Sequence, residues 1–316
     1  MKYLSYRIIF SCLPIFIICC QKHVADSSVS KDLLTTGSFF YEDISYAADT
    51  LFRHKMDIHV PGGLSELAPL VVYIHGGGFR AGKKGGNGVR YCDTLLAQGY
   101  VIADINYRLS QDSIFPAQVY DCKTAIRYLK LNAEKYAIDT TRIGVMGHSA
   151  GGHLSAFLGT SIGIDSLEGY HLGNRGTNSS IHAVIDFFGP TDFLQMDATV
   201  PLTPPDSCKK FMIHDEPNSP ESELLGCLIS ACPERVKQAN PITYVNGNEP
   251  SFAIYHGAFD CLVSPHQSTL LFNKLEAVGV DIEFEIYPHV KHADKFFITP
   301  KMKGKVSDFF NRQFNK

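Results

Sequence analysis

The feature that most constrains this fold is an alternation of short, almost wholly apolar runs with stretches of helical spacing. The apolar runs are rich in β-branched residues and lie at 70–75, 100–107, 142–146, 183–188, 251–256 and 282–287. A strand reads as a continuous apolar run when both of its faces are buried, as they are in a parallel sheet. The alternation therefore predicts an α/β fold, with a mainly parallel sheet and helices on both of its faces.

Several segments between and around these runs predict further elements. Residues 116–131 carry apolar side chains three or four positions apart, a last helix is expected at about 301–310, and His266 is predicted to begin another. Before the first buried strand, the polar-aromatic runs 42–48 and 51–60 predict an antiparallel hairpin or sheet edge.

The composition excludes several classes of protein. Hydrophobic residues make up 45% of the 316 residues and charged residues 19%, so the bulk of the chain is not disordered. The formal charge of −3 gives no basic field for a phosphate backbone, and no nucleic-acid partner is expected. The sequence holds neither a pair of CxxC units nor an HExxH motif, so we predict no metal site and no cofactor.

The N-terminus has the pattern of an export signal. Lys2 and Arg7 precede a mostly apolar run at 8–20, and its length of about 13 residues is too short for a helix that spans a bilayer. The end of the run resembles the lipobox of bacterial lipoproteins, which predicts acylation of Cys20, with Cys19 as the alternative acceptor.

The domain organisation follows from this interpretation. Residues 1–20 are predicted to be a lipoprotein signal peptide and 21–38 a polar tether, with the folded domain at 39–316. The protein is then expected to be exported to the bacterial cell envelope, where it touches the membrane only through its lipid anchor. An ordinary secretory signal and a retained anchor are the alternatives.

One long segment interrupts the alternation of strands and helices. Residues 195–240 contain six prolines and three cysteines and show only a short helical patch near Leu224. An irregular excursion of this length inside a compact domain is typical of a functional cap or of a disordered insert. We interpret it as a cap insertion over the C-terminal edge of the sheet and not as a second domain.

Six cysteines lie outside the N-terminal run: Cys92, Cys122, Cys208, Cys227, Cys232 and Cys261. An exported location permits disulfides. Cys122 lies in a helical stretch and is expected to be a small buried residue. Whether Cys208, Cys227 and Cys232 include one bridge stays open, because pairing does not follow from spacing.

The sequence Gly147-His148-Ser149-Ala150-Gly151 matches G-x-S-x-G. By itself this short pattern is weak, but here it follows the predicted strand 142–146 and precedes a helical stretch at 152–158. That is the strand–turn–helix setting in which the serine of this motif is exposed as a nucleophile. The motif therefore predicts Ser149 as the nucleophile, and the alternative is a glycine-rich helix start without chemistry.

A second glycine motif follows the strand that ends at residue 74. It reads His75-Gly76-Gly77-Gly78-Phe79, and its bare backbone can bring N–H groups close to a substrate oxygen. We predict an oxyanion hole made by Gly76, Gly77, Gly78 and the N–H of Ala150. His75 is expected to brace this loop by hydrogen bonding, and the alternative is that it acts as the base.

A serine nucleophile needs a base, and the base needs a carboxylate that orients it. When the nucleophile follows this strand–turn–helix pattern, the chain order is serine, acid, histidine. Asp260, just after the strand 251–256, is the predicted acid, and Asp192 is its rival, although a turn cap suits Asp192 better. His292 is the predicted base because it lies farther past the last strand, with His289 as the alternative.

Together these motifs resemble the α/β-hydrolase superfamily, within it the HGGG-motif bacterial esterase/lipase group related to hormone-sensitive lipase and to feruloyl-esterase-like carbohydrate esterases. The resemblance extends from about residue 55 to the C-terminus. The matching segments include 75–79, 106–110, 115–118, 147–154, 186–192, 239–242 and 256–260. It implies an α/β-hydrolase fold and a triad of Ser149, Asp260 and His292. The loop 287–294 departs from the usual glycine-rich form, so His289 is retained.

The predicted function is that of a serine carboxylic ester hydrolase acting on short-chain acyl esters, including acetyl or feruloyl groups linked to glycans. Its partners would be a small-molecule or glycan ester. The alternatives are a serine peptidase of the prolyl-oligopeptidase type and a non-catalytic binding lipoprotein with the same fold. Nothing in the sequence predicts an oligomeric state.

Overall fold

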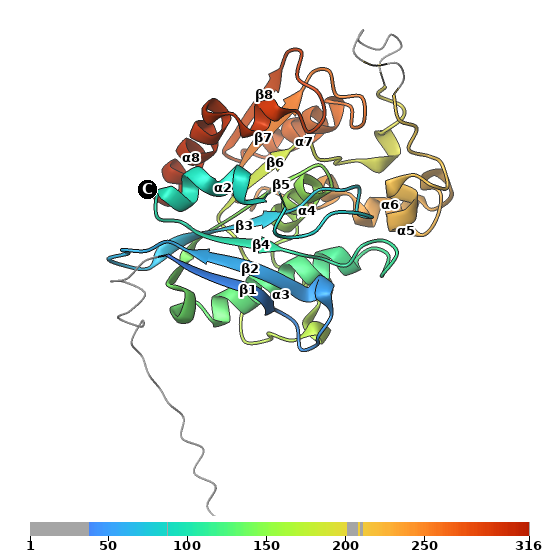
Figure 1. The fold of residues 1–316 in the computed structure, drawn as a ribbon. Coiled ribbons are helices and arrows are strands. Elements are labelled where there is room, and N and C mark those ends of the chain that lie inside the picture. Colours follow the sequence, from blue (N-terminus) through green and yellow to red (C-terminus); the bar gives the residue numbers. More distant parts are fainter. Residues whose placement is uncertain (1–37, 87, 201–207, 209–210, 316) are drawn as a thin grey trace, which may run out of the picture.

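An eight-stranded sheet organises the domain in this computed structural model, which describes residues 38–86, 88–200, 208 and 211–315 (Figure 1). The strands are β1 Phe39–Ser45, β2 Lys55–Val60, β3 Ala68–Ile74, β4 Val101–Ile105, β5 Ile138–His148, β6 Ala183–Phe187, β7 Ser251–Gly257 and β8 Ile282–Tyr287. Their order is β1-β2-β4-β3-β5-β6-β7-β8. Strand β2 pairs antiparallel with β1 and β4, and the other neighbours are parallel.

Helices cover both faces of this sheet. The helices are α2 Gly88–Ala97, α3 Ala117–Leu131, α4 Ala150–Thr160, α5 Pro220–Leu225, α6 Pro233–Ala239, α7 His266–Ala277 and α8 Pro300–Phe314. Helices α2 and α8 pack on one face, and α3, α4 and α7 pack on the other (Figure 1). This is the α/β architecture that the alternation of strands and helices predicts.

Strand side chains divide between these two layers with the period of two that a pleated strand requires. In β3, Leu70, Val72 and Ile74 belong to the core beneath α3 and α4, whereas Val71 and Tyr73 belong to the core beneath α2 and α8. Both faces are buried, and for this reason the strand reads as a continuous apolar run.

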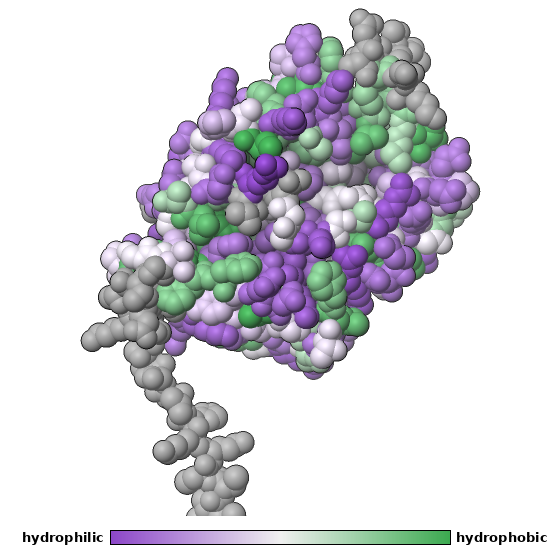
Figure 2. Space-filling view, in the orientation of Figure 1, coloured by the Kyte–Doolittle hydropathy of each residue, from purple (hydrophilic) through white to green (hydrophobic). Residues whose placement is uncertain are grey.

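Hydrophobic and hydrophilic residues are interspersed on the outer face that Figure 2 shows.

The predicted strands are all present, and β5 differs most from its prediction. It begins at Ile138, four residues before the predicted start at 142, because Ile138 pairs with Ala68 of β3. Asp139, Thr140 and Thr141 interrupt the apolar run, so hydrophobicity alone did not reveal this extension. Helix α7 begins at His266 as predicted, and the polar-aromatic runs form the antiparallel pair β1–β2.

The proline- and cysteine-rich excursion lies past the C-terminal ends of the parallel strands and carries α5 and α6 (Figure 1). We call residues 211–240 of this excursion the cap segment. One disulfide, Cys227–Cys232, closes a short loop between the two helices, and a second, Cys208–Cys261, joins the excursion to the loop after β7. Cys92 and Cys122 are free and buried, as expected for Cys122.

The predicted signal peptide, its acceptor Cys20, the alternative Cys19 and all but the last residue of the tether 21–38 lie outside the described residues. Within the part of the chain that the structure describes, none of the helices is both long and apolar enough to cross a bilayer.

Candidate active site

Ser149 stands on a sharp turn between β5 and α4. Its backbone has φ 55° and ψ −121°, a conformation that residues other than glycine rarely adopt. Its N–H donates to the carbonyl of Phe187 at 2.8 Å. The turn passes so close to β3 that a Cβ on Gly151 would lie 2.0 Å from the Ile74 carbonyl oxygen. This close approach therefore requires a glycine at position 151. The turn leaves Ser149 projecting at the N-terminus of α4.

His292 and Asp260 lie in line with Ser149. The Ser149 hydroxyl is 2.9 Å from Nε2 of His292, and Nδ1 of His292 is 2.6 Å from Oδ2 of Asp260. Because a carboxylate only accepts, Nδ1 carries the proton and Nε2 is free to accept the proton of the serine. The structure therefore brings together the three residues that the sequence analysis selected, from loops after β5, β7 and β8.

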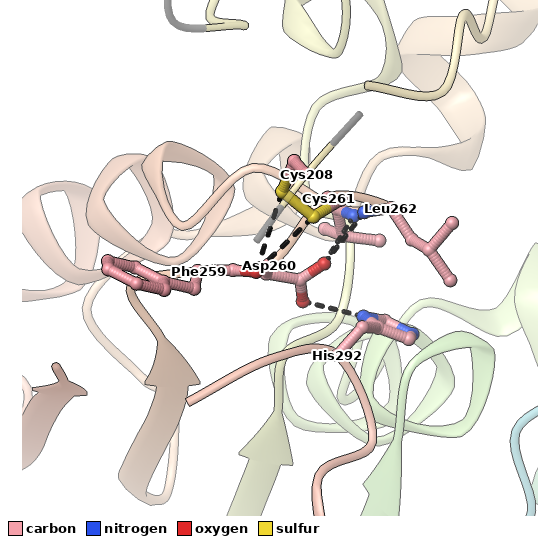
Figure 3. The surroundings of a disulfide bond; sticks show 7 residues. Cys208, Phe259, Asp260, Cys261, Leu262 and His292 are labelled. Atoms are coloured by element: carbon pink, nitrogen blue, oxygen red, sulfur yellow. Dashed lines mark hydrogen bonds and ion pairs between the residues drawn. A yellow bond between two sulfur atoms is a disulfide. The ribbon is translucent and has the colours of Figure 1, made fainter. Parts of the chain in front are cut away.

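Asp260 is buried, with 1% of its surface exposed, and is held by its own loop. The backbone N–H groups of Leu262 and Val263 each donate to Oδ1 at 2.9 Å. Burial alone would raise the pKa of Asp260, but the His292 imidazole and the hydrogen bonds from His256 and His292 outweigh it and hold that pKa well below the usual value. The carboxylate is therefore ionised at neutral pH. Figure 3 shows it between His292 and the Cys208–Cys261 disulfide.

The two rival residues lie elsewhere. His289 is exposed, its ring contacts Phe259 at 4.9 Å, and it makes no hydrogen bond to Ser149. Asp192 caps the short 3-10 helix Phe193–Gln195 by accepting from the N–H of Leu194, which is the turn-cap role that suits it.

The predicted oxyanion residues are only partly brought together. Gly77, Gly78 and Ala150 line the cavity at Ser149, and no backbone N–H of these three donates to a described residue. Gly76 is not in the lining; a Cβ there would lie 2.7 Å from the His148 carbonyl oxygen, so this glycine serves close packing. Gly76 therefore does not face the cavity as an oxyanion donor should, and Gly77 and Gly78 remain the predicted donors of this loop.

His75 braces the glycine loop as predicted. Its Nδ1 lies 2.8 Å from the carbonyl oxygen of Gly76, its ring stacks on Tyr107, and the Tyr107 hydroxyl donates to the carbonyl of His75. Burial lowers the pKa of His75 to about 4, so the ring is neutral.

A cavity of about 400 Å³ opens at Ser149. The glycine loop and His292 form one part of its wall, and Leu262 and Val263 of the Asp260 loop form another. The cap segment contributes four further lining residues, Met212, His214, Pro220 and Glu221. The excursion thus shapes the space in which a substrate would lie. Among the described residues, no cluster of three or more His, Cys, Asp or Glu side chains could hold a metal ion.

One residue at the catalytic carboxylate was not predicted from the sequence. His256, fully buried at the end of β7, places Nε2 at 3.1 Å from Oδ2 of Asp260 and 3.0 Å from the Val263 carbonyl, and its Nδ1 pairs with the Ser268 hydroxyl at 2.7 Å. Both partners of Nε2 only accept, so Nε2 carries the proton and donates. The signal was present in His256-Gly257-Ala258-Phe259-Asp260, because residues i and i+4 around a tight turn can meet.

Replacing His256 with phenylalanine is expected to lower kcat about tenfold while KM stays unchanged, because a hydrogen bond to a charged group is lost and Asp260 orients His292 less firmly. His256→Gln, which keeps a donor, should recover most of the rate. Steady-state kinetics with a thermal melt of each variant are the measurement. A lower melting temperature with an unchanged kcat would assign His256 to the core alone.

Comparison with known proteins gives the family. The BD-FAE family model matches residues 56–275, which include Ser149 and Asp260. The chain belongs to the BD-FAE family. Its fold is the α/β-hydrolase fold, as the sequence resemblance implied.

Relatives of this BD-FAE chain carry esterase names. Esterase LipC of Mycobacterium tuberculosis is 30% identical over 212 residues, which cover 67% of this chain and 49% of LipC. The probable carboxylic ester hydrolase LipM of the same organism is 25% identical over 267 residues, covering 84% of this chain and 57% of LipM. The chain thus spans about half the length of these curated relatives.

Among solved structures, a truncated form of a carbohydrate esterase from gut microbiota has a TM-score of 0.79 and 32% identity, covering 91% of this chain and 99% of that one. A bifunctional GH43-CE protein of Bacteroides eggerthii has a TM-score of 0.75 and 33% identity, covering 87% of this chain and 38% of that one.

Proposed function

We propose that this protein is a serine carboxylic ester hydrolase. The observation that carries the proposal is the hydrogen-bonded row of Ser149, His292 and Asp260 at the wall of a cavity. Such a row activates a hydroxyl that is otherwise a poor nucleophile. Membership of the BD-FAE family and the esterase names of the relatives support it.

In this mechanism Oγ of Ser149 attacks the ester carbonyl carbon while its proton passes to Nε2 of His292. The tetrahedral oxygen accepts hydrogen bonds from the N–H groups of Gly77, Gly78 and Ala150, where the N-terminus of α4 also favours negative charge. The intermediate collapses, and His292 donates its proton to the leaving alcohol. Water then attacks the acyl carbon while His292 takes its proton. The bond from that carbon to Oγ breaks, the acid leaves, and His292 returns the proton to Ser149.

We propose short-chain acyl esters as the substrate class, with acetyl or feruloyl groups on glycans as the natural examples. The similarity to a carbohydrate esterase over nearly the whole of that chain supports this choice. A cavity of about 400 Å³ accommodates a small acyl group together with part of its alcohol.

We also propose an exported, lipid-anchored location. Its support is the charged start, the apolar run at 8–20 and the lipobox-like end at Cys20.

A substrate panel tests the function. Purified protein is assayed with p-nitrophenyl acetate, p-nitrophenyl butyrate, methyl ferulate, acetylated xylo-oligosaccharides and a chromogenic peptide amide. We expect hydrolysis of the acetyl esters and no cleavage of the amide. Cleavage of the peptide alone would instead support the peptidase alternative, and inactivity on all five would support a binding protein.

A further inference from the structure

Two charged residues of the cap segment meet inside the active-site cavity. His214 and Glu221 both line the cavity, and both are 3% exposed. Nδ1 of His214 lies 2.8 Å from Oε2 of Glu221, and Nε2 lies 2.9 Å from the carbonyl oxygen of Leu262. The mechanism above uses neither residue.

The contacts define the charge state of this pair. Both ring nitrogens of His214 face atoms that only accept, so the doubly protonated imidazolium satisfies both. Burial lowers the pKa of His214, but the hydrogen bond and charge of Glu221 outweigh it and raise that pKa above the usual value. The imidazolium contacts only one of the two oxygens of the buried Glu221 carboxylate, Oε2.

The other oxygen of Glu221 is left for a ligand. Oε1 makes no hydrogen bond to a described residue. It is also not sealed from solvent, unlike the buried side-chain atoms that lack a partner. It is therefore accessible from the cavity that Glu221 lines. Three lining residues near the pair are apolar, Met212 and Pro220 of the cap segment and Leu262 of the Asp260 loop. Glu221 is the one residue in this lining that carries a carboxylate.

A carboxylate oxygen beside these apolar side chains discriminates between substrates. A purely alkyl ester would remove water from Oε1 without replacing its hydrogen bond, which is costly. A substrate hydroxyl placed there donates to Oε1 and compensates for the lost water. Sites built to bond a hydroxyl reject the analogue that lacks it far more strongly than apolar pockets reject a missing methylene.

We propose that the His214–Glu221 pair is a specificity site that binds a hydroxyl group of the ester substrate through Oε1 of Glu221. This inference rests on the proposed esterase function and specifies its substrates as hydroxyl-bearing esters. The hydroxyl belongs either to the sugar that carries the acyl group or to the phenol of a feruloyl group. Both donate in the same way.

The test compares Glu221→Gln with the wild type on two substrate pairs. Acetylated xylotriose is paired with p-nitrophenyl acetate, and methyl ferulate with methyl 3,4-dimethoxycinnamate, which lacks the phenol hydroxyl. We expect kcat/KM to fall about tenfold for at least one hydroxyl-bearing substrate and less than twofold for its partner. Glu234→Gln makes the same chemical change on the exposed surface of α6 and should alter none of the four rates.

The outcomes separate this inference from the proposed function. A loss confined to xylotriose assigns the hydroxyl to the alcohol, and a loss confined to ferulate assigns it to the acyl group. Equal losses on all four substrates, or no loss on any, overturn the specificity site while the esterase function stands. Titration of acetylated xylotriose and methyl ferulate into Ser149→Ala, with and without Glu221→Gln, measures binding without turnover. If the wild type is inactive, a Glu221 dependence there supports the site, and its absence overturns it.

Discussion

Replacing Ser149 with alanine is expected to lower kcat on p-nitrophenyl acetate by about 10⁶-fold, the loss that follows removal of a triad serine elsewhere. The hydroxyl at 2.9 Å from His292 is the group that bonds to the acyl carbon in the proposed mechanism. Without it, water must attack directly. The glycine loop and the Ala150 N–H still stabilise the oxyanion, so a small residual rate above the uncatalysed reaction should remain.

A serine at the other end of α4 serves as the control for this variant. Ser161 is also buried, but its hydroxyl donates to the carbonyl of Phe157, and Ser161→Ala should keep the wild-type rate. An alkyl phosphonate ester should react with the nucleophile, and mass spectrometry should then detect one added phosphonyl group on the wild type and on Ser161→Ala. Ser149→Ala should gain none. Retained turnover in Ser149→Ala, measured against a blank purification, would falsify the assignment of the nucleophile.

The second large effect concerns the base. His292→Asn is expected to lower kcat by about 10⁶-fold, comparable to the serine variant, because no other described side chain accepts the proton of Ser149. Asparagine removes the imidazole and keeps a polar side chain of similar reach. The double variant with Ser149→Ala should be no slower than either single one, because the residues of a triad act as a unit.

His289→Asn is the matched control for this experiment. His289 has φ 63°, and asparagine tolerates this left-handed conformation better than most residues, so the loop should keep its path. We expect its activity to stay within about threefold of the wild type, given that triad losses are orders of magnitude larger. If the large loss fell on His289→Asn and spared His292→Asn, the base would have been assigned to the wrong histidine.

Much of the active site could be predicted because its signals are local. The G-x-S-x-G motif predicts both the strand-to-helix turn and the nucleophile Ser149. The three glycines after β3 predict a loop whose backbone can approach a substrate closely. Asp260 was found because a polar residue just past a parallel strand lies at the edge where sites form. His292 and His289 could not be separated on physical grounds other than reach.

The helical cap could be predicted only as an irregular excursion. Its composition indicated an insertion, but its contacts depend on residues far apart in the chain. Cys208 pairs with Cys261 across 53 positions, and His214 reaches the carbonyl of Leu262 across 48. A spacing pattern contains no information on such pairs.

By itself, the amino-acid sequence determined the parallel sheet, the sharp turn at Ser149 and the glycine loop, because apolar periodicity and glycine geometry act between near neighbours. Only the tertiary structure decided that His292 is the imidazole at Ser149, 143 positions away, and that His256 is a second donor to Asp260. It alone placed the carboxylate of Glu221 in the cavity. These choices depend on how loops at the ends of different strands converge, and the free energy of that convergence comes from packing of the whole domain.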